Sequence, residues 1–240
     1  MGPTTIKKIS YVIPVFNEEE NIPTLYSEVT TVSRKLGYPY EIIFVNDCSS
    51  DNSLSLLKKL TRTDKKVRCL SFAKNCGQSA ALAAGFEAVT GDTVITMDAD
   101  LQNDPADIPY LLTHYKKSDM VTGWRHNRQD TLSKRWASKF GNGVRNLLTG
   151  DSIHDTGCSL KILKASYLKR IKIFKGLHRF LPTLMRMEGA TVVEAKVNHR
   201  PRVHGYSKYS NWRRGIEGFQ DLLAVRWMIK RNLSYISKEV

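Results

Sequence analysis

The stretch Thr93-Val-Ile-Thr-Met-Asp-Ala-Asp-Leu-Gln102 joins a short apolar run directly to two carboxylates and an amide. The run Thr93–Met97 has the length and the β-branched content of a buried strand. If the chain turns after it, Asp98, Asp100 and Gln102 can converge on one Mg²⁺ or Mn²⁺ ion, because these hard cations prefer oxygen ligands. Taken alone, two acids spaced by one residue fit a loop of solvated or salt-bridged carboxylates equally well.

Strand-like and helix-like segments alternate around this stretch over the first 125 residues. The alternation predicts an α/β fold with a mostly parallel sheet flanked by helices. After residue 125 we expect a polar loop, a basic helix, a late strand, a cationic loop and a terminal helix. The expected strands are Ile9–Val15, Glu41–Asn46, Val67–Phe72, Thr93–Met97, Met120–Gly123 and Val192–Asn198. The expected helices end near Leu36, Leu60, Val89, Lys117, Thr149 and Arg231.

The length of 240 residues suits one large domain, and 41% hydrophobic residues are ordinary for a globular protein. No internal repeat, low-complexity tract or Pro/Gly-rich linker divides the chain. We therefore expect one main domain over residues 1–210, followed by a basic amphipathic helix over residues 211–240.

The charge balance favours an anionic partner, because 37 Lys and Arg residues outnumber 23 Asp and Glu residues and give a net charge of +14. Solubility alone is the plainer explanation. The four cysteines form no C-x-x-C pair, which favours reduced thiols in a cytosolic protein. No run approaches the roughly 18 apolar residues of a spanning helix, so we expect membrane contact to be peripheral or through a membrane-spanning partner subunit.

Polar, turn-forming residues follow each of the first four expected strands. Because ligands bind at the carboxyl ends of parallel strands, these residues predict one site at that edge of the sheet. The segments are Val12-Ile-Pro-Val-Phe-Asn-Glu-Glu19, Phe44-Val-Asn-Asp-Cys-Ser-Ser-Asp51, Lys74-Asn-Cys-Gly-Gln-Ser79 and residues 98–104.

These segments, in this order, resemble the family 2 glycosyltransferases of GT-A fold, and most of all their polyprenyl-phosphate branch. The resemblance covers residues 8–210. It implies an inverting transfer of a hexose-type sugar from a nucleotide-sugar donor to a polyprenyl phosphate, with Mg²⁺ or Mn²⁺ as the cofactor. A UDP-sugar is the first expectation for the donor and GDP-mannose the second.

The resemblance also implies roles for individual residues. Asp47 corresponds to the acid that reads the base of the nucleotide. Asn46 stands where many relatives carry an acid, which leaves the fine base preference open. The nucleotide-sugar site is expected to comprise Pro14, Phe16, Glu18, Asn46, Asp47, Gln78 and Asp98. The metal site is expected to comprise Asp98, Asp100 and Gln102.

Asp155, in His154-Asp-Thr-Gly-Cys-Ser-Leu160, corresponds to the position usually assigned as the catalytic base. A second interpretation is an acid that anchors its own tight turn through Gly157. A phosphate monoester, with a second pKa near 6, is already nucleophilic at neutral pH. Such an acceptor needs orientation more than deprotonation, and Asp155 then positions a substrate instead of removing a proton.

Cations are concentrated in the second half of the chain. Arg125 and Arg135 flank the polar loop, and His199-Arg-Pro-Arg-Val-His-Gly-Tyr-Ser-Lys-Tyr209 carries further cations. The resemblance implies that this segment holds the donor diphosphate and the acceptor phosphate, a task that suits the planar fork of arginine. A solvated basic loop is the alternative. The expected catalytic residues are Asp155, Arg202 and Lys208, and the expected acceptor or diphosphate ligands are Arg125, Arg135, Arg200 and Ser207.

The terminal segment is basic and amphipathic. From residue 196 to the end, ten Lys or Arg residues stand against three acids. An apolar stripe at helical spacing either packs on the domain or lies in a lipid interface, and the sequence leaves both open. The stripe consists of Trp212, Ile216, Phe219, Leu223 and Trp227.

Three other functions fit the sequence less well. One is a polysaccharide synthase of the same fold, acting on a hydroxyl acceptor. Such synthases share a Q-x-x-R-W signature, but here Arg226-Trp227 is preceded by Leu223 at the position of the Gln. A dinucleotide-dependent oxidoreductase requires G-x-G-x-x-G after the first strand, where this chain has acids. Acids at the strand ends also repel a nucleic-acid backbone, so we expect no nucleic-acid partner. We expect the chain at the cytoplasmic face of a membrane, and homo-oligomerisation remains open.

Overall fold

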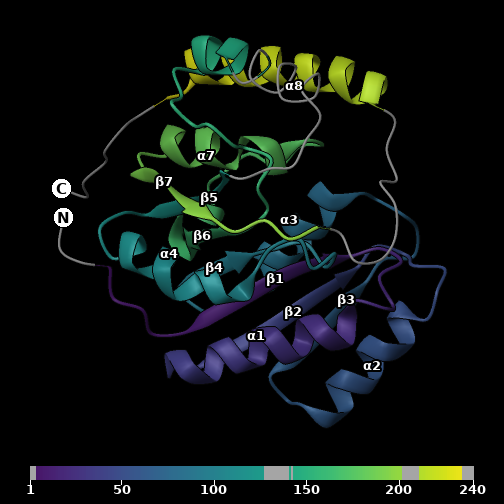
Figure 1. Ribbon diagram of the computed structural model, residues 1–240. Helices are drawn as coiled ribbons and strands as arrows, with labels where there is room; N and C mark the ends of the chain where they lie inside the picture. Colours follow the sequence, from purple (N-terminus) through teal and green to yellow (C-terminus); the bar gives the residue numbers. More distant parts are fainter. Residues whose placement is uncertain (1–3, 127–140, 142, 202–210, 234–240) are drawn as a thin grey trace, which may run out of the picture.

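The computed structural model describes residues 4–126, 141, 143–201 and 211–233, with the backbone alone for 211–216. Within these residues, a seven-stranded sheet has the order β3-β2-β1-β4-β6-β5-β7 (Figure 1). Only β6 runs antiparallel to its neighbours β4 and β5, so the prediction of a mostly parallel sheet is confirmed. The strands are β1 (Ile9–Val15), β2 (Tyr40–Asn46), β3 (Val67–Ser71), β4 (Thr93–Thr96), β5 (Met120–Arg125), β6 (Lys161–Lys164) and β7 (Val192–Val197).

Helices cover both faces of this sheet (Figure 1). One face carries α1 (Ile22–Leu36), α2 (Ser53–Thr63), η1 (Pro105–Asp107) and α4 (Ile108–Tyr115). The other carries α3 (Gln78–Ala88), α6 (Ala165–Leu168), α7 (Leu177–Met187), α8 (Asn211–Arg231) and the helical residues 143–149. Alternate residues of β1 belong to the two opposite core clusters, Tyr11 and Ile13 to one and Val12 to the other. This is the burial expected of a strand inside a parallel sheet.

Most expected elements agree with the structure to within a few residues. The predicted helix start at Asp104-Pro105 is confirmed, because the Asp104 side chain accepts a hydrogen bond from the Ala106 backbone N–H (2.9 Å). Residues 143–149 are helical as predicted, whereas the predicted loop over residues 127–131 and the predicted helix over residues 132–140 lie outside the described residues. No sequence pattern predicted β6, α6 and α7.

The terminal helix α8 packs on the domain with a face other than the predicted stripe. Leu222 and Val225 are buried in the core cluster of α7. Phe219, Leu223 and Trp227 are 54%, 48% and 64% exposed. Of the two alternatives that the sequence left open, the one in which the stripe packs on the domain is therefore wrong for these three residues. None of the described helices combines the length and the apolar character that crossing a bilayer requires.

Candidate functional site

The loops that follow β1 and β2 are bound to each other at the carboxyl edge of the sheet. The Asn17 side-chain oxygen accepts from the Ser50 backbone N–H (2.8 Å), and Glu19 accepts from the Asn52 backbone N–H (2.8 Å). In return, Asp51 accepts from the Glu19 backbone N–H (3.1 Å). These reciprocal bonds fix the wall that carries the predicted nucleotide ligands Pro14, Phe16 and Glu18, all of which are partly buried.

Asp47, the predicted base-reading acid, is buried and holds the start of α3. Its two carboxylate oxygens accept from the backbone N–H groups of Cys76 (2.6 Å) and Gly77 (2.8 Å). Gly77 has φ +86° and ψ 163°, a conformation that residues with a Cβ rarely adopt. Asn46 is also buried and bridges Ser71 (3.0 Å) and the Ser49 backbone N–H (3.4 Å). The two bonds that Asp47 accepts use two of the roughly four acceptor positions of a carboxylate, which leaves room for a bond to a base N–H. Base recognition by Asp47 stays a prediction.

The predicted metal ligands lie in a turn directly after β4. Leu101 has φ +59°, so the chain turns between Asp100 and Gln102, and the Gln102 backbone N–H donates to Asp100 (3.2 Å). Gln78, at the start of α3, donates its side-chain amide to Asp98 (2.7 Å). Burial first, and repulsion from Asp100 second, raise the pKa of Asp98 to about 6. An acid whose pKa is raised by burial and by a neighbouring carboxylate is a fitting ligand for a divalent cation.

The donor set for such a cation is small. Among the described residues, no three or more His, Cys, Asp or Glu side chains gather in an arrangement that could hold a metal. The candidate set is therefore the two carboxylates of Asp98 and Asp100 with the amide of Gln102. Oxygen ligands of this kind fit Mg²⁺ or Mn²⁺, which commonly keep positions for substrate phosphates.

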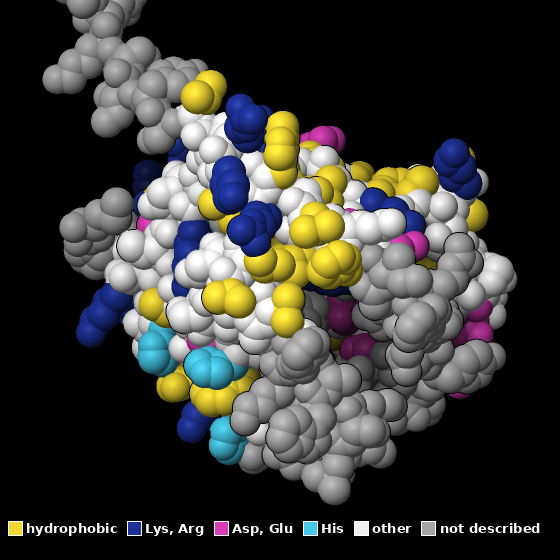
Figure 2. Space-filling view, turned by 90° about the horizontal axis from the view of Figure 1, so that it is seen from above, with side chains coloured by type: hydrophobic (Ala, Val, Ile, Leu, Met, Phe, Trp, Pro, Cys, Tyr) yellow, Lys and Arg dark blue, Asp and Glu magenta, His cyan; other side chains and the backbone are white. Residues whose placement is uncertain are grey.

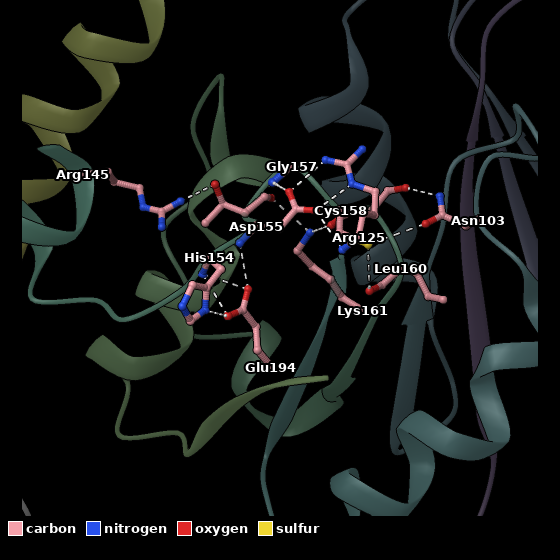
Figure 3. A network of polar contacts seen from close by, with 12 residues as sticks. Asn103, Arg125, Arg145, His154, Asp155, Gly157, Cys158, Leu160, Lys161 and Glu194 are labelled. Carbon is pink, nitrogen blue, oxygen red and sulfur yellow. Dashed lines mark hydrogen bonds and ion pairs between the residues drawn. The ribbon is translucent and has the colours of Figure 1, made fainter. Parts of the chain in front are cut away.

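Asp155 forms a two-pronged ion pair with Arg125 beside this turn (Figure 3). Arg125 donates from Nε to Oδ2 (2.7 Å) and from Nη2 to Oδ1 (2.9 Å) of Asp155. The backbone N–H groups of Arg125 (3.2 Å) and Gly157 (3.1 Å) donate to the same carboxylate. Burial opposes the charge of Arg125, but Asp155 outweighs it and raises the pKa of the guanidinium. The predicted turn through Gly157 is thus present, together with an unpredicted partner for Asp155.

Three residues that the sequence analysis missed hold the loop around Asp155 (Figure 3). Glu194 accepts from the backbone N–H groups of His154 (2.9 Å) and Asp155 (2.8 Å). Arg145 donates to the Thr156 hydroxyl and to the Ile153 carbonyl. Lys161 donates to the carbonyls of Thr156 and Cys158. The only sequence signal for any of them is a single lysine inside the apolar run Leu160-Lys-Ile-Leu163.

The predicted phosphate ligand Arg200 binds carboxylates in this structure. Its guanidinium contacts Glu28 of α1 (2.8 Å) and Asp104 (2.7 Å), and its backbone N–H donates to the Gln102 carbonyl (3.0 Å). Arg200 therefore ties the segment after β7 to the turn of the predicted metal ligands, and its role toward phosphate stays a prediction. The remaining predicted cations and hydroxyl lie outside the described residues; they are Arg135, Arg202, Ser207 and Lys208.

Two curated relatives share most of this chain. An undecaprenyl-phosphate 4-deoxy-4-formamido-L-arabinose transferase of Pseudomonas fluorescens is 40% identical over 89% of this chain and 63% of its own length. A dodecaprenyl-phosphate galacturonate synthase of Rhizobium johnstonii is 35% identical over 95% of this chain and 69% of its own length. The chain thus spans less than two thirds of the first relative and slightly more than two thirds of the second.

Solved structures share the fold at low sequence identity. Glucosyl-3-phosphoglycerate synthase from Mycobacterium tuberculosis, in complex with Mn²⁺ and UDP-glucose, superposes with a TM-score of 0.69 at 16% identity, over 92% of this chain and 79% of that one. Mannosyl-3-phosphoglycerate synthase from Rubrobacter xylanophilus gives a TM-score of 0.70 at 13% identity, over 96% and 77%. The predicted GT-A fold is confirmed.

The family described as Glycosyl transferase family 2 matches residues 10–172, which include β1 to β6 and the turn of the metal ligands. The match covers more than half of the sequence and agrees with the resemblance carried by the strand-end motifs. The chain belongs to glycosyltransferase family 2.

Proposed function

We propose that this member of family 2 is a glycosyltransferase that moves a hexose-type sugar from a nucleotide-sugar donor to a polyprenyl phosphate, with inversion at the anomeric carbon. The names of both curated relatives, a transferase to undecaprenyl phosphate and a dodecaprenyl-phosphate synthase, support the acceptor class. The observation that carries the proposal is the Arg125–Asp155 pair beside Asp98, which places an oriented guanidinium next to a candidate metal site. A guanidinium and a metal ion next to each other suit a reaction between two anionic phosphates, because each cation can offset the charge of one of them.

The metal is proposed to be Mg²⁺ or Mn²⁺, held by Asp98, Asp100 and Gln102. When bound, such an ion neutralises charge on the diphosphate leaving group. Two observations support the choice: burial and the neighbouring Asp100 raise the pKa of Asp98, and the fold relatives from Mycobacterium tuberculosis include a complex with Mn²⁺ and UDP. UDP in that complex also supports a UDP-sugar ahead of GDP-mannose as our proposed donor.

Asp155 is proposed to orient Arg125 and not to remove a proton. Both of its carboxylate oxygens accept hydrogen bonds from Arg125, which uses Nε and Nη2 for the purpose. In the described part of the chain, no hydrogen bond engages Nη1 of Arg125, so this group can donate to a phosphate oxygen. A phosphate acceptor that is already anionic needs such a donor more than a base.

The cations outside the described residues complete the proposal. Arg202, Lys208 and Arg135, with the Ser207 hydroxyl, are proposed to bind the donor diphosphate and the incoming acceptor phosphate. In support, Arg200 precedes Arg202 by two positions in the sequence, and its backbone N–H donates to the Gln102 carbonyl.

A transfer assay tests the whole proposal. A polyprenyl phosphate is incubated with a panel of UDP-sugars and GDP-mannose in the presence of Mn²⁺, and the anomeric configuration of the product is determined. Thermal shifts with the same donors identify which one the folded protein binds. Transfer to a hydroxyl acceptor but not to the phosphate, or retention of the donor's configuration, would refute the proposal.

We further propose that the chain works at the cytoplasmic face of a membrane and contacts the bilayer through the outer face of α8. All four cysteines are free, as expected in a reducing compartment. Figure 2 shows hydrophobic and basic side chains intermixed on the side of the molecule where α8 lies. The apolar members are Phe219, Leu223 and Trp227, each about half exposed or more.

The charges of α8 favour an anionic lipid surface over an unspecified partner. Its two acids are each paired within the domain, Glu217 with Lys175 (3.2 Å) and Asp221 with Arg179 (4.0 Å). Among the described residues, no ion pair joins an acid to the cations along its last turns, which are Arg226, Lys230 and Arg231. Each cation near an anionic bilayer contributes about 1 kcal/mol, and the apolar side chains add to this.

Co-sedimentation with vesicles of phosphatidylglycerol and phosphatidylcholine, free of polyprenyl phosphate, tests this contact. Leu223→Ser with Trp227→Ser should weaken binding at least tenfold. Tyr110→Ser on α4 is the matched control, because Tyr110 is also 48% exposed. Equal binding by both variants, or self-association that the double variant alone abolishes, would refute a lipid contact.

A further inference from the structure

Lys161 is a buried lysine on an interior strand of the sheet. It is 2% exposed and lies on β6, opposite Thr96 of β4 and Thr122 of β5. Within the described part of the chain, no ion pair joins its ammonium group to a carboxylate. Burying an ammonium without such a pair is costly, and an apolar side chain of similar size would fill the same volume at lower cost. Packing alone therefore gives no reason for a charge at this position.

The contacts of Lys161 are two backbone carbonyls of the loop that carries Asp155 (Figure 3). Its Nζ donates to the carbonyl oxygens of Thr156 (3.4 Å) and Cys158. With these carbonyls turned toward the sheet, the backbone N–H of Gly157 points the other way and donates to Asp155 (3.1 Å). The ammonium group thus binds the backbone carbonyls of the loop, while Arg125 binds the carboxylate of Asp155 on the same loop.

The charges around Lys161 belong to the reaction site. Burial lowers its pKa, whereas Cys158, Asp155 and Asp98 favour its charged form. Arg125 opposes that charge, so the lysine is electrostatically linked to both members of the Arg125–Asp155 pair. The negative charges of Asp98 and Asp155 thus face the positive charges of Arg125 and Lys161 at the carboxyl ends of β4 and β5.

We propose that Lys161 is a positioning residue for the Arg125–Asp155 pair. By holding the carbonyls of Thr156 and Cys158 it fixes the loop that presents Asp155, and through Asp155 it sets the direction of the Arg125 guanidinium. This inference rests on the function proposed above for Arg125, but the ion pair itself can be followed without any transfer reaction.

The first experiment compares Lys161→Met with Lys164→Met. Lys164 lies on the same strand, at the other edge of the sheet, and pairs with Asp119 (3.2 Å). Because misplacement by about 1 Å can cost 10²-fold in rate, we expect Lys161→Met to lower kcat 10- to 100-fold, with the donor KM changed less than threefold. The melting temperature should not fall, and Lys164→Met should keep the wild-type kcat. Wild-type turnover in Lys161→Met would overturn the proposal.

A double-mutant cycle and a spectroscopic signal separate positioning from a general structural role. In an Asp155→Asn background the further loss from Lys161→Met should disappear, because both changes release the same guanidinium. Fully additive losses would overturn the proposal. The Nε–Hε resonance of Arg125, assigned by its absence in Arg125→Lys, should shift toward the solvent-exposed position in Lys161→Met. An unshifted resonance would also overturn it, even if the protein transfers no sugar.

Should Lys161→Met fail to fold, Lys161→Gln is measured in the same two ways. The glutamine side chain is one atom shorter than that of lysine, so we expect its amide not to reach both carbonyls, and the substitution also removes the charge. A shifted Arg125 resonance with reduced kcat supports the proposal, and an unshifted resonance with wild-type kcat overturns it.

Discussion

Two carboxylates at opposite edges of the sheet have pKa values shifted in opposite directions. Glu41, at the amino end of β2, is 4% exposed and accepts hydrogen bonds from Ser10 (2.7 Å), Thr90 (2.7 Å) and Arg68 (2.9 Å). Burial raises its pKa, but the hydroxyls and the guanidinium outweigh burial and lower it to about 2. Asp98, at the carboxyl end of β4, is partly buried, and its pKa is raised to about 6.

The difference lies in what surrounds each acid. Glu41 is satisfied by donors from three segments, so its charge binds the fold together. Asp98 has Gln78 as a donor but also Asp100 as a neighbouring charge, so its ionised form is disfavoured in the absence of a bound cation. Strongly shifted acids of the second kind are typical of functional sites, and those of the first kind are typical of structural ones.

The largest effect is expected when a negative charge is removed at the carboxyl edge of the sheet. Asp98→Asn or Asp100→Asn should lower transfer on the order of 10²–10³, because the candidate cation loses a carboxylate ligand. EDTA should have the same effect on the wild type, with recovery on adding Mn²⁺. Glu41→Gln, at the other edge, is the control and should keep the wild-type kcat. Full transfer in EDTA would contradict the assignment.

Asp155 tests whether location or hydrogen bonding decides the role of an acid. It lies at the active edge, like Asp98, but is fully engaged by donors, like Glu41. We expect Arg202→Ala or Lys208→Ala to lower kcat at least as much as Asp155→Asn, on a polyprenyl phosphate at neutral pH with saturating donor. An inactive Asp155→Asn beside two cation variants of near-normal turnover would indicate a hydroxyl acceptor, and the lipid-phosphate proposal would then fail.

At the amino edge we expect an effect on stability alone. Glu41→Gln should lower the free energy of unfolding by about 2–3 kcal/mol at neutral pH, because a charged and hydrogen-bonded group becomes neutral. The folded-state pKa of about 2 lies below the ordinary 4.5, so this contribution is complete above pH 4.5 and is lost as the pH falls toward 2. Urea unfolding of both proteins between pH 3 and 7 measures it; a difference that does not shrink toward pH 3 would contradict the pKa.

The smallest expected effect has the opposite sign. Asp98→Asn should raise the free energy of unfolding by about 1–2 kcal/mol at pH 7.5 in EDTA, because a disfavoured charge is removed. The folded-state pKa of about 6 lies above the ordinary 3.8, so the wild type is relatively most stable below pH 3.8 and loses this stability as the pH rises through 6. The gain should therefore be smaller at pH 5 than at pH 7.5. Equal unfolding energies at both values would argue against a raised pKa.

The sequence determined much of the framework through local signals. Short, mainly apolar runs predicted β1 and β2, and the cap at Asp104 predicted the start of the helical segment after it, because both signals act within a few residues. The segment from β6 to α7 escaped prediction for equally local reasons. β6 has four residues, one of them Lys161, and α7 contains Pro182, which removes a backbone donor from the helix.

The candidate site divides in the same way. The sequence by itself predicted Asp98 and Asp100 as candidate metal ligands, because the two acids lie within three residues at the end of a strand. Only the tertiary structure paired Arg125 with Asp155, 30 positions away, and brought Glu194 to the same loop. It also decided which face of α8 is buried, since a helix with apolar residues on two sides can pack with either. Contacts between distant segments depend on how the elements pack, and no local pattern of residues records that.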